Sequence, residues 1–408
     1  MSFIPCSPED QQKPFQPLYK MKITNVEAFW LRCPIPKEKQ HISDYGKLTD
    51  FDMTLVVVTD DNGMQGFGEA KAAVGSSGVC ASIVSCVENE LKPILVGKEA
   101  GNITQLWEMM YNGTRDHYAL DRGRAFPVLG RRGLTISAMS GVDTALWDLK
   151  GKALGVPVVD LLGGPCRSQM PAYASGGWAS VDAIGEQLSG YVAKGFQGVK
   201  MRVGVMDKTV TTSVARVRAA REALGPDIKL MADAHGTYSV PEAKQFCRGV
   251  EDANLYWFEE PVSPDNRHGT AEVRKSTSIP IAAGESEFTC FDVRDLIELR
   301  AIDVVQPDSA IIGGISEAIR VGHLARTYQL ELAPHCWGSA FSFMAGVSVA
   351  FACPSSTIIE FSLGGNPLMY ELVKENIQTK DGMIEVPSSP GLGLTPDWDF
   401  VKEYSQKV

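Results

Sequence analysis

The chain lacks several features that mark common classes of protein. Its 408 residues include nine cysteines, but they are widely spaced and form no Cys-x-x-Cys pair, which argues against the commonest zinc and dithiol redox motifs. No apolar run reaches the roughly 20 residues that a membrane-spanning helix needs. The N-terminus has no basic start followed by an apolar run, as a signal peptide would have. We therefore expect a cytoplasmic protein with reduced thiols and no membrane partner.

Sequence motifs of several enzyme classes are also missing. There is no His-x-His or His-Glu-x-x-His zinc motif, no Gly-x-Ser-x-Gly nucleophile turn and no P-loop. Positive charge is in deficit, because 39 Lys and Arg stand against 49 Asp and Glu, a net charge of −10. This argues against a nucleic-acid partner, which needs a basic face. A small anionic substrate remains possible, because the local charge of a pocket matters more than the total.

The first third of the chain has the pattern of a small mixed domain. We expect residues 1–20 to be a poorly ordered or surface-docked extension. Residues 21–133 then predict an α+β domain with a three-stranded antiparallel sheet, because strand-like segments end in turn signals and helical segments follow. The strands are expected at 22–29, 53–59 and 66–70, and the helices near 81–95 and 103–111.

From residue 134 to about 380, strands and helices alternate. A helix with apolar spacing runs from residue 134 and is expected to stop at Gly155. Short apolar strands separated by helical patterns imply parallel βαβ units, and eight of them fit a TIM-type barrel. The Pro/Gly-rich segment 381–408 is expected to fold back onto the first domain. The strands are predicted at 170–173, 198–201, 229–232, 255–258, 279–283, 302–306, 330–334 and 357–361.

Acidic residues follow three consecutive strands of this barrel. Asp233, Glu259 and Glu285 each come about one βα unit after the previous one. The carboxyl ends of barrel strands converge on one mouth, where crowded carboxylates repel unless a cation neutralises them. Hard oxygen ligands suit Mg²⁺. Adjacent strand residues point to opposite faces, so we expect only one of Glu259 and Glu260 to reach the mouth.

Basic and proton-carrying residues follow the other strands. Lys200 and Arg202 end the second strand at positions i and i+2, so both side chains should face the site. Asp308 follows the sixth strand and His335 the seventh, and an Asp on one strand can orient a His on the next. Glu360 ends the eighth strand and adds one more polar group facing inward.

From residue 22 to the C-terminus the chain resembles the mandelate racemase subgroup of the enolase superfamily. The resemblance implies a (β/α)₇β barrel with an N-terminal α+β cap that the C-terminal segment completes. It also implies Mg²⁺ on Asp233, Glu259 and Glu285, a His335–Asp308 pair on one side of a hydroxy-acid substrate, and a homo-oligomer. The motifs that carry it are the segment from Gly141 to Lys152, Leu161-Leu162-Gly163-Gly164, Lys200-Met201-Arg202, Asp233, Glu259-Glu260-Pro261, Gly284-Glu285, Gln306-Pro307-Asp308, Gly313-Gly314, His335 and Glu360.

The chain departs from the commonest pattern of this subgroup at two positions. Many relatives carry a second Lys, acting as the base, where Arg202 stands, and a guanidinium is a poor base because it stays protonated. Relatives also often carry Asn where His235 stands. We hypothesise that His235 or Lys200 takes one acid–base role beside His335, while Arg202 holds substrate oxygens.

The resemblance implies removal of the proton next to a carboxylate through an enediolate. Dehydration of an aldonate or aldarate to a 2-keto-3-deoxy acid is favoured, because His235 and His335 supply two proton carriers near neutral pH. The alternatives are a racemase, an epimerase or a lactone cycloisomerase using the same site, or a non-catalytic protein that binds sugar acids. A lid at residues 36–51 and a basic stretch could hold the distal end of the substrate, although that stretch could also be a solvated surface; its arginines are Arg115, Arg122, Arg124, Arg131 and Arg132.

Overall fold

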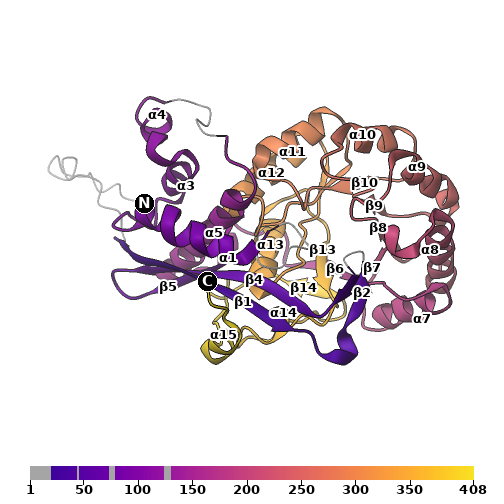
Figure 1. Cartoon of the computed structure of the whole chain (residues 1–408), viewed down its shortest axis with the longest axis horizontal. Coiled ribbons are helices and arrows are strands. Elements are labelled where there is room, and N and C mark those ends of the chain that lie inside the picture. Colours follow the sequence, from indigo (N-terminus) through magenta and orange to yellow (C-terminus); the bar gives the residue numbers. More distant parts are fainter. Residues whose placement is uncertain (1–19, 44–45, 73–78, 124–129) are drawn as a thin grey trace, which may run out of the picture.

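The computed structural model describes residues 20–43, 46–72, 79–123 and 130–408, which form a cap and a barrel (Figure 1). Three antiparallel strands make the cap sheet in the order β1-β4-β5. They are β1 (Ile23–Pro34), β4 (Asp50–Asp60) and β5 (Gln65–Ala70), all within or extending the predicted segments. Asp60 fixes the turn between β4 and β5, because its Oδ1 accepts hydrogen bonds from the backbone N–H groups of Asn62 and Met64.

Helices cover one face of the cap sheet. The segment predicted as one helix near 81–95 is helical throughout but contains a π-helical turn at Val87–Leu91, between α1 (Val79–Cys86) and α2 (Lys92–Leu95). Next come α3 (Ile103–Asn112) and α4 (Asp116–Leu120). The short strands β2 (His41–Ser43) and β3 (Gly46–Leu48) pair within the predicted lid, of which residues 44 and 45 lie outside the described residues.

Helix α5 (Leu134–Leu154) joins the cap to the barrel. It ends at Gly155, which takes the left-handed conformation (φ 69°) expected of a helix C-cap. Its apolar side packs on β4 and β5, and the approach to β5 is close enough that a Cβ on Gly68 would lie 2.1 Å from the Gly141 carbonyl oxygen. Its buried Asp143 accepts hydrogen bonds from the backbone N–H and the hydroxyl of Ser316 in the barrel, at 2.9 and 2.6 Å.

Eight parallel strands form the barrel, in the connectivity (β/α)₇β. The predicted alternation is confirmed, although several observed strands are shorter than predicted. The strands are β6 (Gln169–Ser175), β7 (Gly198–Arg202), β8 (Lys229–Asp233), β9 (Trp257–Glu259), β10 (Ile281–Ala283), β11 (Val304–Val305), β12 (Glu331–Leu332) and β13 (Ile359–Ser362). Consecutive strands pair from β6 to β12, and β13 pairs with β6. A bridge between Leu332 and Ser356 links the two ends of this order.

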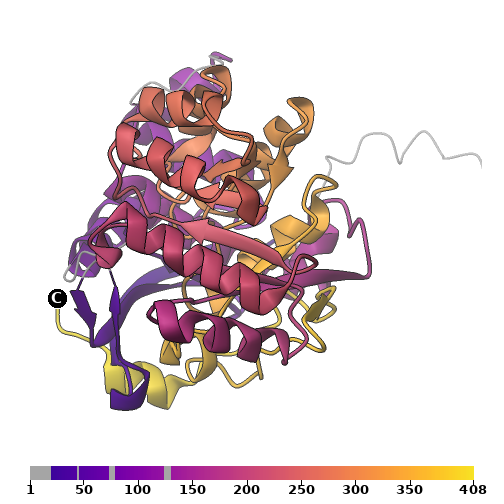
Figure 2. The same ribbon diagram turned by 90° about the vertical axis from the view of Figure 1, so that its right-hand side faces the viewer.

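Seven helices connect the barrel strands. Figure 2 shows several of them, in magenta to orange, lying in front of the strands. Tyr173, Met231 and Trp257 fill the interior below the carboxyl ends of the strands. The barrel interior is therefore a packed core rather than an open channel. The helices are α7 (Val181–Val192), α8 (Val210–Leu224), α9 (Val240–Gly249), α10 (Arg267–Lys275), α11 (Thr289–Glu298), α12 (Gly314–Thr327) and α13 (Ala340–Ala352).

The C-terminal segment runs from the barrel back to the cap. It contributes β14 (Met383–Glu385), which pairs antiparallel with β6, and α15 (Trp398–Tyr404) beside β1. Gln406 donates a backbone hydrogen bond to the Trp30 carbonyl at 2.8 Å. The chain thus completes the cap with its last residues, as predicted, while the exact boundaries at residues 134 and 381 stay predictions. Within the described ranges, no helix is both long and apolar enough to cross a membrane.

Candidate active site

Three carboxylates end consecutive barrel strands. Asp233 is the last residue of β8, Glu259 is the last of β9, and Glu285 lies two residues beyond β10. Asp233 and Glu259 are partners in the parallel register, so their side chains project to the same side of the sheet. Each of the three residues is at most 4% exposed. The strand ends therefore bring these acidic groups into one buried cluster.

Glu259 is held by Lys200 on β7, by Trp257 on its own strand and by Gln306, which follows β11. Its Oε1 accepts from Lys200 Nζ at 2.5 Å, and its Oε2 accepts from Trp257 Nε1 at 2.9 Å and from Gln306 Nε2 at 2.7 Å. Hydrogen-bond donors placed in this way fix the orientation of a carboxylate. Neither Trp257 nor Gln306 was assigned a site role from the sequence.

Lys200 lies among carboxylates rather than in an open part of the site. Besides Glu259, its ammonium is 3.0 Å from Glu360 and 3.8 Å from Asp233. Burial alone would lower the pKa of Lys200, but Glu259 and Glu360 outweigh it and hold that pKa well above its ordinary value. Arg202 follows Lys200 by two residues on β7, and its Nη1 lies 3.0 Å from Asp233 Oδ2. Both cations of the second strand thus face the acidic cluster.

Asp308 and His335 form the expected pair, with Oδ2 2.7 Å from Nδ1. The other imidazole nitrogen, Nε2, faces Glu285 at 3.5 Å and Glu360 at 3.9 Å. Burial works against a charged imidazole, but Glu285, Glu360 and Asp308 together raise the pKa of His335 to about 9. The carboxylate of Asp308 keeps a pKa below its usual range, because Lys71 and His335 outweigh the effect of burial.

A second imidazole reaches the same cluster from β8. His235 follows Asp233 by two residues, with a left-handed backbone (φ 47°) and its N–H bonded to Asp233 Oδ1 at 2.8 Å. Its Nε2 lies 3.7 Å from Glu285 Oε1, whereas His335 lies near Oε2 of the same carboxylate. The two histidines therefore approach Glu285 through its two different oxygens.

The expectation that only one of Glu259 and Glu260 would reach the mouth is wrong. Strand β9 ends at Glu259, and the left-handed backbone of Glu260 (φ 39°) breaks the alternation of side chains. Glu260 is 3% exposed and joins the cluster, where one of its carboxylate oxygens, an imidazole nitrogen of His235 and a carboxylate oxygen of Glu285 all lie within 4.8 Å of one another.

The crowded carboxylates fit a metal ion. Burial raises the pKa of Asp233 to about 7, and Glu259 and Glu285 add to this against the opposing effect of Arg202. Burial and the neighbouring Glu285 hold the pKa of Glu260 well above its usual range. A divalent cation would relieve this repulsion, and carboxylate oxygens with an imidazole are suitable ligands. Among the described residues, the potential ligand atoms that lie within 4.8 Å of one another are those of His235, Glu260 and Glu285, a group that shares only Glu285 with the predicted ligands. The ligand set Asp233, Glu259 and Glu285 therefore stays a prediction.

One further charged residue reaches the site from the cap. Lys71, directly after β5, lies with its ammonium 2.7 Å from Asp308 Oδ2 and donates to the Trp337 carbonyl. Glu69, two residues earlier, accepts from the Ser339 hydroxyl at 2.6 Å. The sequence carried a usable signal here, because a Glu and a Lys two residues apart end an otherwise uncharged strand.

The basic stretch of the cap is partly committed to protein contacts. Arg131 bonds Glu90 and the Tyr111 carbonyl, and Arg132 bonds Asp292 at 3.0 Å. Arg124 lies outside the described residues. These contacts make Arg131 and Arg132 part of the cap structure and of its joint with the barrel.

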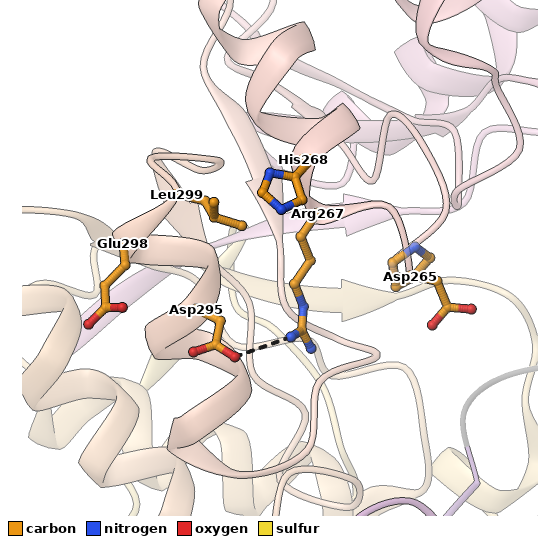
Figure 3. Close-up of a pocket in the computed structure, with 7 residues that line it drawn as sticks. Asp265, Arg267, His268, Asp295, Glu298 and Leu299 are labelled. Atoms are coloured by element: carbon orange, nitrogen blue, oxygen red, sulfur yellow. Dashed lines mark ion pairs between the residues drawn. The ribbon is translucent and has the colours of Figure 1, made fainter.

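One pocket lies away from this cluster, between α10 and α11 (Figure 3). Arg267 enters it and pairs with Asp295 at 3.5 Å, shown by the dashed line. None of the predicted site residues lines it; the lining residues are Pro264, Asp265, Arg267, His268, Asp295, Glu298 and Leu299.

Comparison with known proteins places the chain in a family. Residues 183–400 match the family described as Enolase C-terminal domain-like, and residues 36–163 match the Mandelate racemase / muconate lactonizing enzyme, N-terminal domain. An arabinonate dehydratase of Saccharolobus solfataricus is 33% identical over 88% of this chain and 93% of its own length.

Two further proteins are similar over most of their length. A D-galactarolactone cycloisomerase of Agrobacterium fabrum is 31% identical, over 86% of this chain and 90% of its own. The crystal structure of a putative mandelate racemase from Bordetella bronchiseptica superposes with a TM-score of 0.85 at 33% identity, covering 95% of each chain. The chain therefore belongs to the mandelate racemase/muconate lactonizing enzyme family of the enolase superfamily.

Proposed function

We propose that this enzyme is a Mg²⁺-dependent dehydratase of acid sugars, acting on an aldonate or aldarate. The observation that carries the proposal is the pair of imidazoles, His235 and His335, on the two oxygens of Glu285. Dehydration needs one group to take the proton next to the carboxylate and another to protonate the departing hydroxyl. Imidazoles suit both tasks near neutral pH, and a cation held by Glu285 would bring the pKa of His335 down from about 9 towards that range, because Glu285 is the neighbour that raises it most. The similarity to an arabinonate dehydratase supports the same class of substrate.

The metal and the two cations of β7, Lys200 and Arg202, have separate tasks in this proposal. Asp233, Glu259 and Glu285 would hold Mg²⁺, which stabilises the negative charge that develops on the substrate carboxylate when the proton leaves. Arg202 would hold substrate oxygens. Lys200 is the weakest candidate for the base, because three carboxylates surround its ammonium. Its contacts suit the orientation of Glu259 and Glu360.

The balanced reaction is loss of one water. His335 or His235 accepts the proton from C2, the C3 hydroxyl leaves with a proton from the second group, and the resulting enol becomes a 2-keto-3-deoxy acid. α-Proton exchange in D₂O with His335→Asn, His235→Asn and Lys200→Ala assigns the base. If His235→Asn and Lys200→Ala both exchange at the wild-type rate, neither residue carries the role considered for it.

A panel of acid sugars with Mg²⁺, assayed for 2-keto products, tests the proposed reaction. The proposal expects turnover of at least one aldonate or aldarate. Activity confined to apolar acids such as mandelate would refute it.

The second candidate is a lactone cycloisomerase or an epimerase, which the similarity to a D-galactarolactone cycloisomerase favours. Proton NMR separates the two reactions, because ring opening or exchange without a keto product indicates the second candidate. Tight binding of a sugar acid with no α-proton exchange would indicate a non-catalytic binding protein. A cytoplasmic location and a homo-oligomeric state stay predictions.

A further inference from the structure

Lys71 is the point where the cap touches the proposed acid–base pair. It follows β5, and its backbone N–H donates to the Ala310 carbonyl at 3.1 Å, beyond the end of β11. Its ammonium lies 2.7 Å from Asp308 Oδ2 and also donates to the Trp337 carbonyl, beyond the end of β12. One cap residue therefore contacts the segments that follow both barrel strands carrying the pair.

The neighbouring Glu69 anchors the same strand end to the barrel. Its Oε2 accepts from the N–H of Ser339 at 2.8 Å, from the hydroxyl of Ser339 at 2.6 Å, and from the N–H of Ser342 at 3.2 Å. Because residues i and i+2 of a strand point to the same side, Glu69 and Lys71 dock together. The position of the ammonium is thus set by backbone and side-chain contacts on both sides of it.

Lys71 is also a costly group to place there without a partner. Its side chain is 12% exposed and that of Asp308 is fully buried, so the ammonium has lost most of its water. Burial alone would lower the pKa of Lys71, but Asp308 and Glu69 raise it above its ordinary value. The lysine is therefore a fixed cation of the interior rather than a surface charge.

The two oxygens of Asp308 are shared among four donors. Oδ1 accepts from the Ala310 N–H at 2.8 Å and from the Ser342 hydroxyl at 3.4 Å. Oδ2 is common to Lys71 Nζ and His335 Nδ1, each at 2.7 Å. The lysine and the histidine therefore meet on a single oxygen, and the ammonium restricts the rotation of the carboxylate that orients the imidazole.

We propose that Lys71 is a positioning residue for the Asp308–His335 pair, so that the acid–base machinery is complete only when the cap strand β5 is docked on the barrel. The inference rests on the proposed function for the catalytic role of His335, whereas the positioning of Asp308 and His335 by Lys71 does not depend on it. The lysine acts through Asp308 and touches no reacting atom. Removing it should loosen the imidazole and slow proton transfer, while substrate and metal binding change little.

The test compares Lys71→Met with Lys71→Arg and with the control Lys152→Met. Lys152, on α5, also has a buried partner, Asp148 at 2.6 Å, and donates to the Gln65 carbonyl at the start of β5. It therefore contacts the same cap strand as Lys71 does, but it is not in contact with Asp308 or His335. We expect Lys71→Met to lower kcat by about tenfold to a hundredfold with little change in KM, as for other groups that orient a functional side chain. Lys71→Arg should recover part of kcat, and Lys152→Met should keep the wild-type kcat.

A measurement without turnover keeps the inference testable if the proposed reaction is wrong. The ring nitrogens of His335 can be followed by NMR in protein labelled with ¹⁵N-histidine, assigned by their absence in His335→Asn. We expect Lys71→Met to shift these resonances and Lys152→Met to leave them in place. If no acid sugar is turned over by the wild type, the proposed function fails and these resonances alone decide the role of Lys71.

Three results would overturn the inference. One is a folded Lys71→Met with wild-type kcat. Another is a raised KM at unchanged kcat, which would make Lys71 a substrate-binding residue. The third is an unchanged His335 spectrum in Lys71→Met, which would leave the lysine a purely structural link between cap and barrel.

Discussion

Each of the two neighbouring glutamates at the end of β9 has its own surroundings. Glu259 is fixed by Lys200, Trp257 and Gln306, whereas Glu260 accepts from Ser286 at 3.2 Å and lies beside His235 and Glu285. A ligand held from behind by several donors loses little freedom when a metal binds. This favours Glu259 as a metal ligand, even though Glu260 is also within reach of the cluster.

We therefore expect Glu259→Gln to weaken Mg²⁺ binding more than Glu260→Gln does. The substitution removes the charge but keeps the shape. Loss of an outer-shell partner typically weakens metal binding by about tenfold to a hundredfold, and loss of a ligand should weaken it at least as much. Isothermal titration of both variants with Mg²⁺ measures the difference. Weaker binding in Glu260→Gln than in Glu259→Gln would transfer the ligand role to Glu260.

Some site residues could be predicted from the sequence and others could not. The carboxylates and the Asp308–His335 pair were predictable, because residues at the ends of parallel strands must share one mouth. The role of Glu260 was not, because nothing in the sequence signals a left-handed backbone at a glutamate. Lys71 was missed because it follows a strand of the cap: the Glu69 and Lys71 pattern marks a polar strand end, but it does not say which part of the barrel that end packs against.

Among the elements, α5 carries much of the contact between cap and barrel. The motif from Gly141 to Lys152 supplies Asp143, which bonds the start of α12, and Asp148, which accepts from the N–H groups of Phe67 and Leu392 at 2.9 and 2.8 Å. Asp148 thus ties a cap strand to the C-terminal segment. The motif that helped to identify the family is structural, and it holds the parts that meet at the site.

The buried Asp143 gives a prediction about stability and pH. Burial raises its pKa to about 7 in the folded protein, from an ordinary value of 3.8. The folded state therefore keeps a proton that the unfolded chain loses, so this contribution to stability is full below about pH 4 and is lost as the pH rises to about 7. The Asn side chain in Asp143→Asn resembles a protonated Asp and does not titrate, so this variant should not lose stability in this way as the pH rises.

Urea unfolding of wild type and Asp143→Asn at pH 5 and pH 8 measures the effect. From pH 5 to pH 8, the free energy of unfolding of the variant should rise by roughly 2–4 kcal/mol relative to that of the wild type. Asp160→Asn, an exposed helix residue, is the control. The same pH dependence in wild type and Asp143→Asn would show that Asp143 does not titrate in this range.

The elements themselves were largely predictable. The barrel strands follow apolar runs whose ends carry the polar residues, and the period of strand and helix leaves few alternatives to a barrel. Their lengths were overestimated where the flanking residues leave the sheet, as in β11, which keeps two of five predicted residues. The π-helical turn at Val87–Leu91 has no recognisable signal in the sequence.

For the whole molecule, the acidic cluster links metal binding to stability. Buried carboxylates with raised pKa values repel one another, and a cation that binds only the folded state stabilises it by mass action. At a Mg²⁺ concentration of about one hundred times Kd, the gain is about 2.7 kcal/mol. Thermal unfolding of protein treated with EDTA should therefore shift to higher temperature when Mg²⁺ is added.

The shift should be absent in Asp233→Asn, which loses a predicted ligand but keeps the shape of the side chain. An equal shift in that variant would mean that the stabilising metal binds elsewhere. This control is needed because a cation bound at a distant site would also raise the unfolding temperature.

In the proposed function, the strand-end cluster removes the proton next to a carboxylate. Incubation of an aldonate in D₂O with metal-free enzyme, with Mg²⁺ added back, and with His335→Asn tests it most directly by ¹H NMR. We predict deuterium incorporation at C2 or conversion to the keto acid only in the Mg²⁺-loaded wild type, with the rate of His335→Asn lower by about a hundredfold or more. A rate in the metal-free enzyme or in His335→Asn equal to that of the Mg²⁺-loaded wild type would contradict the proposed mechanism.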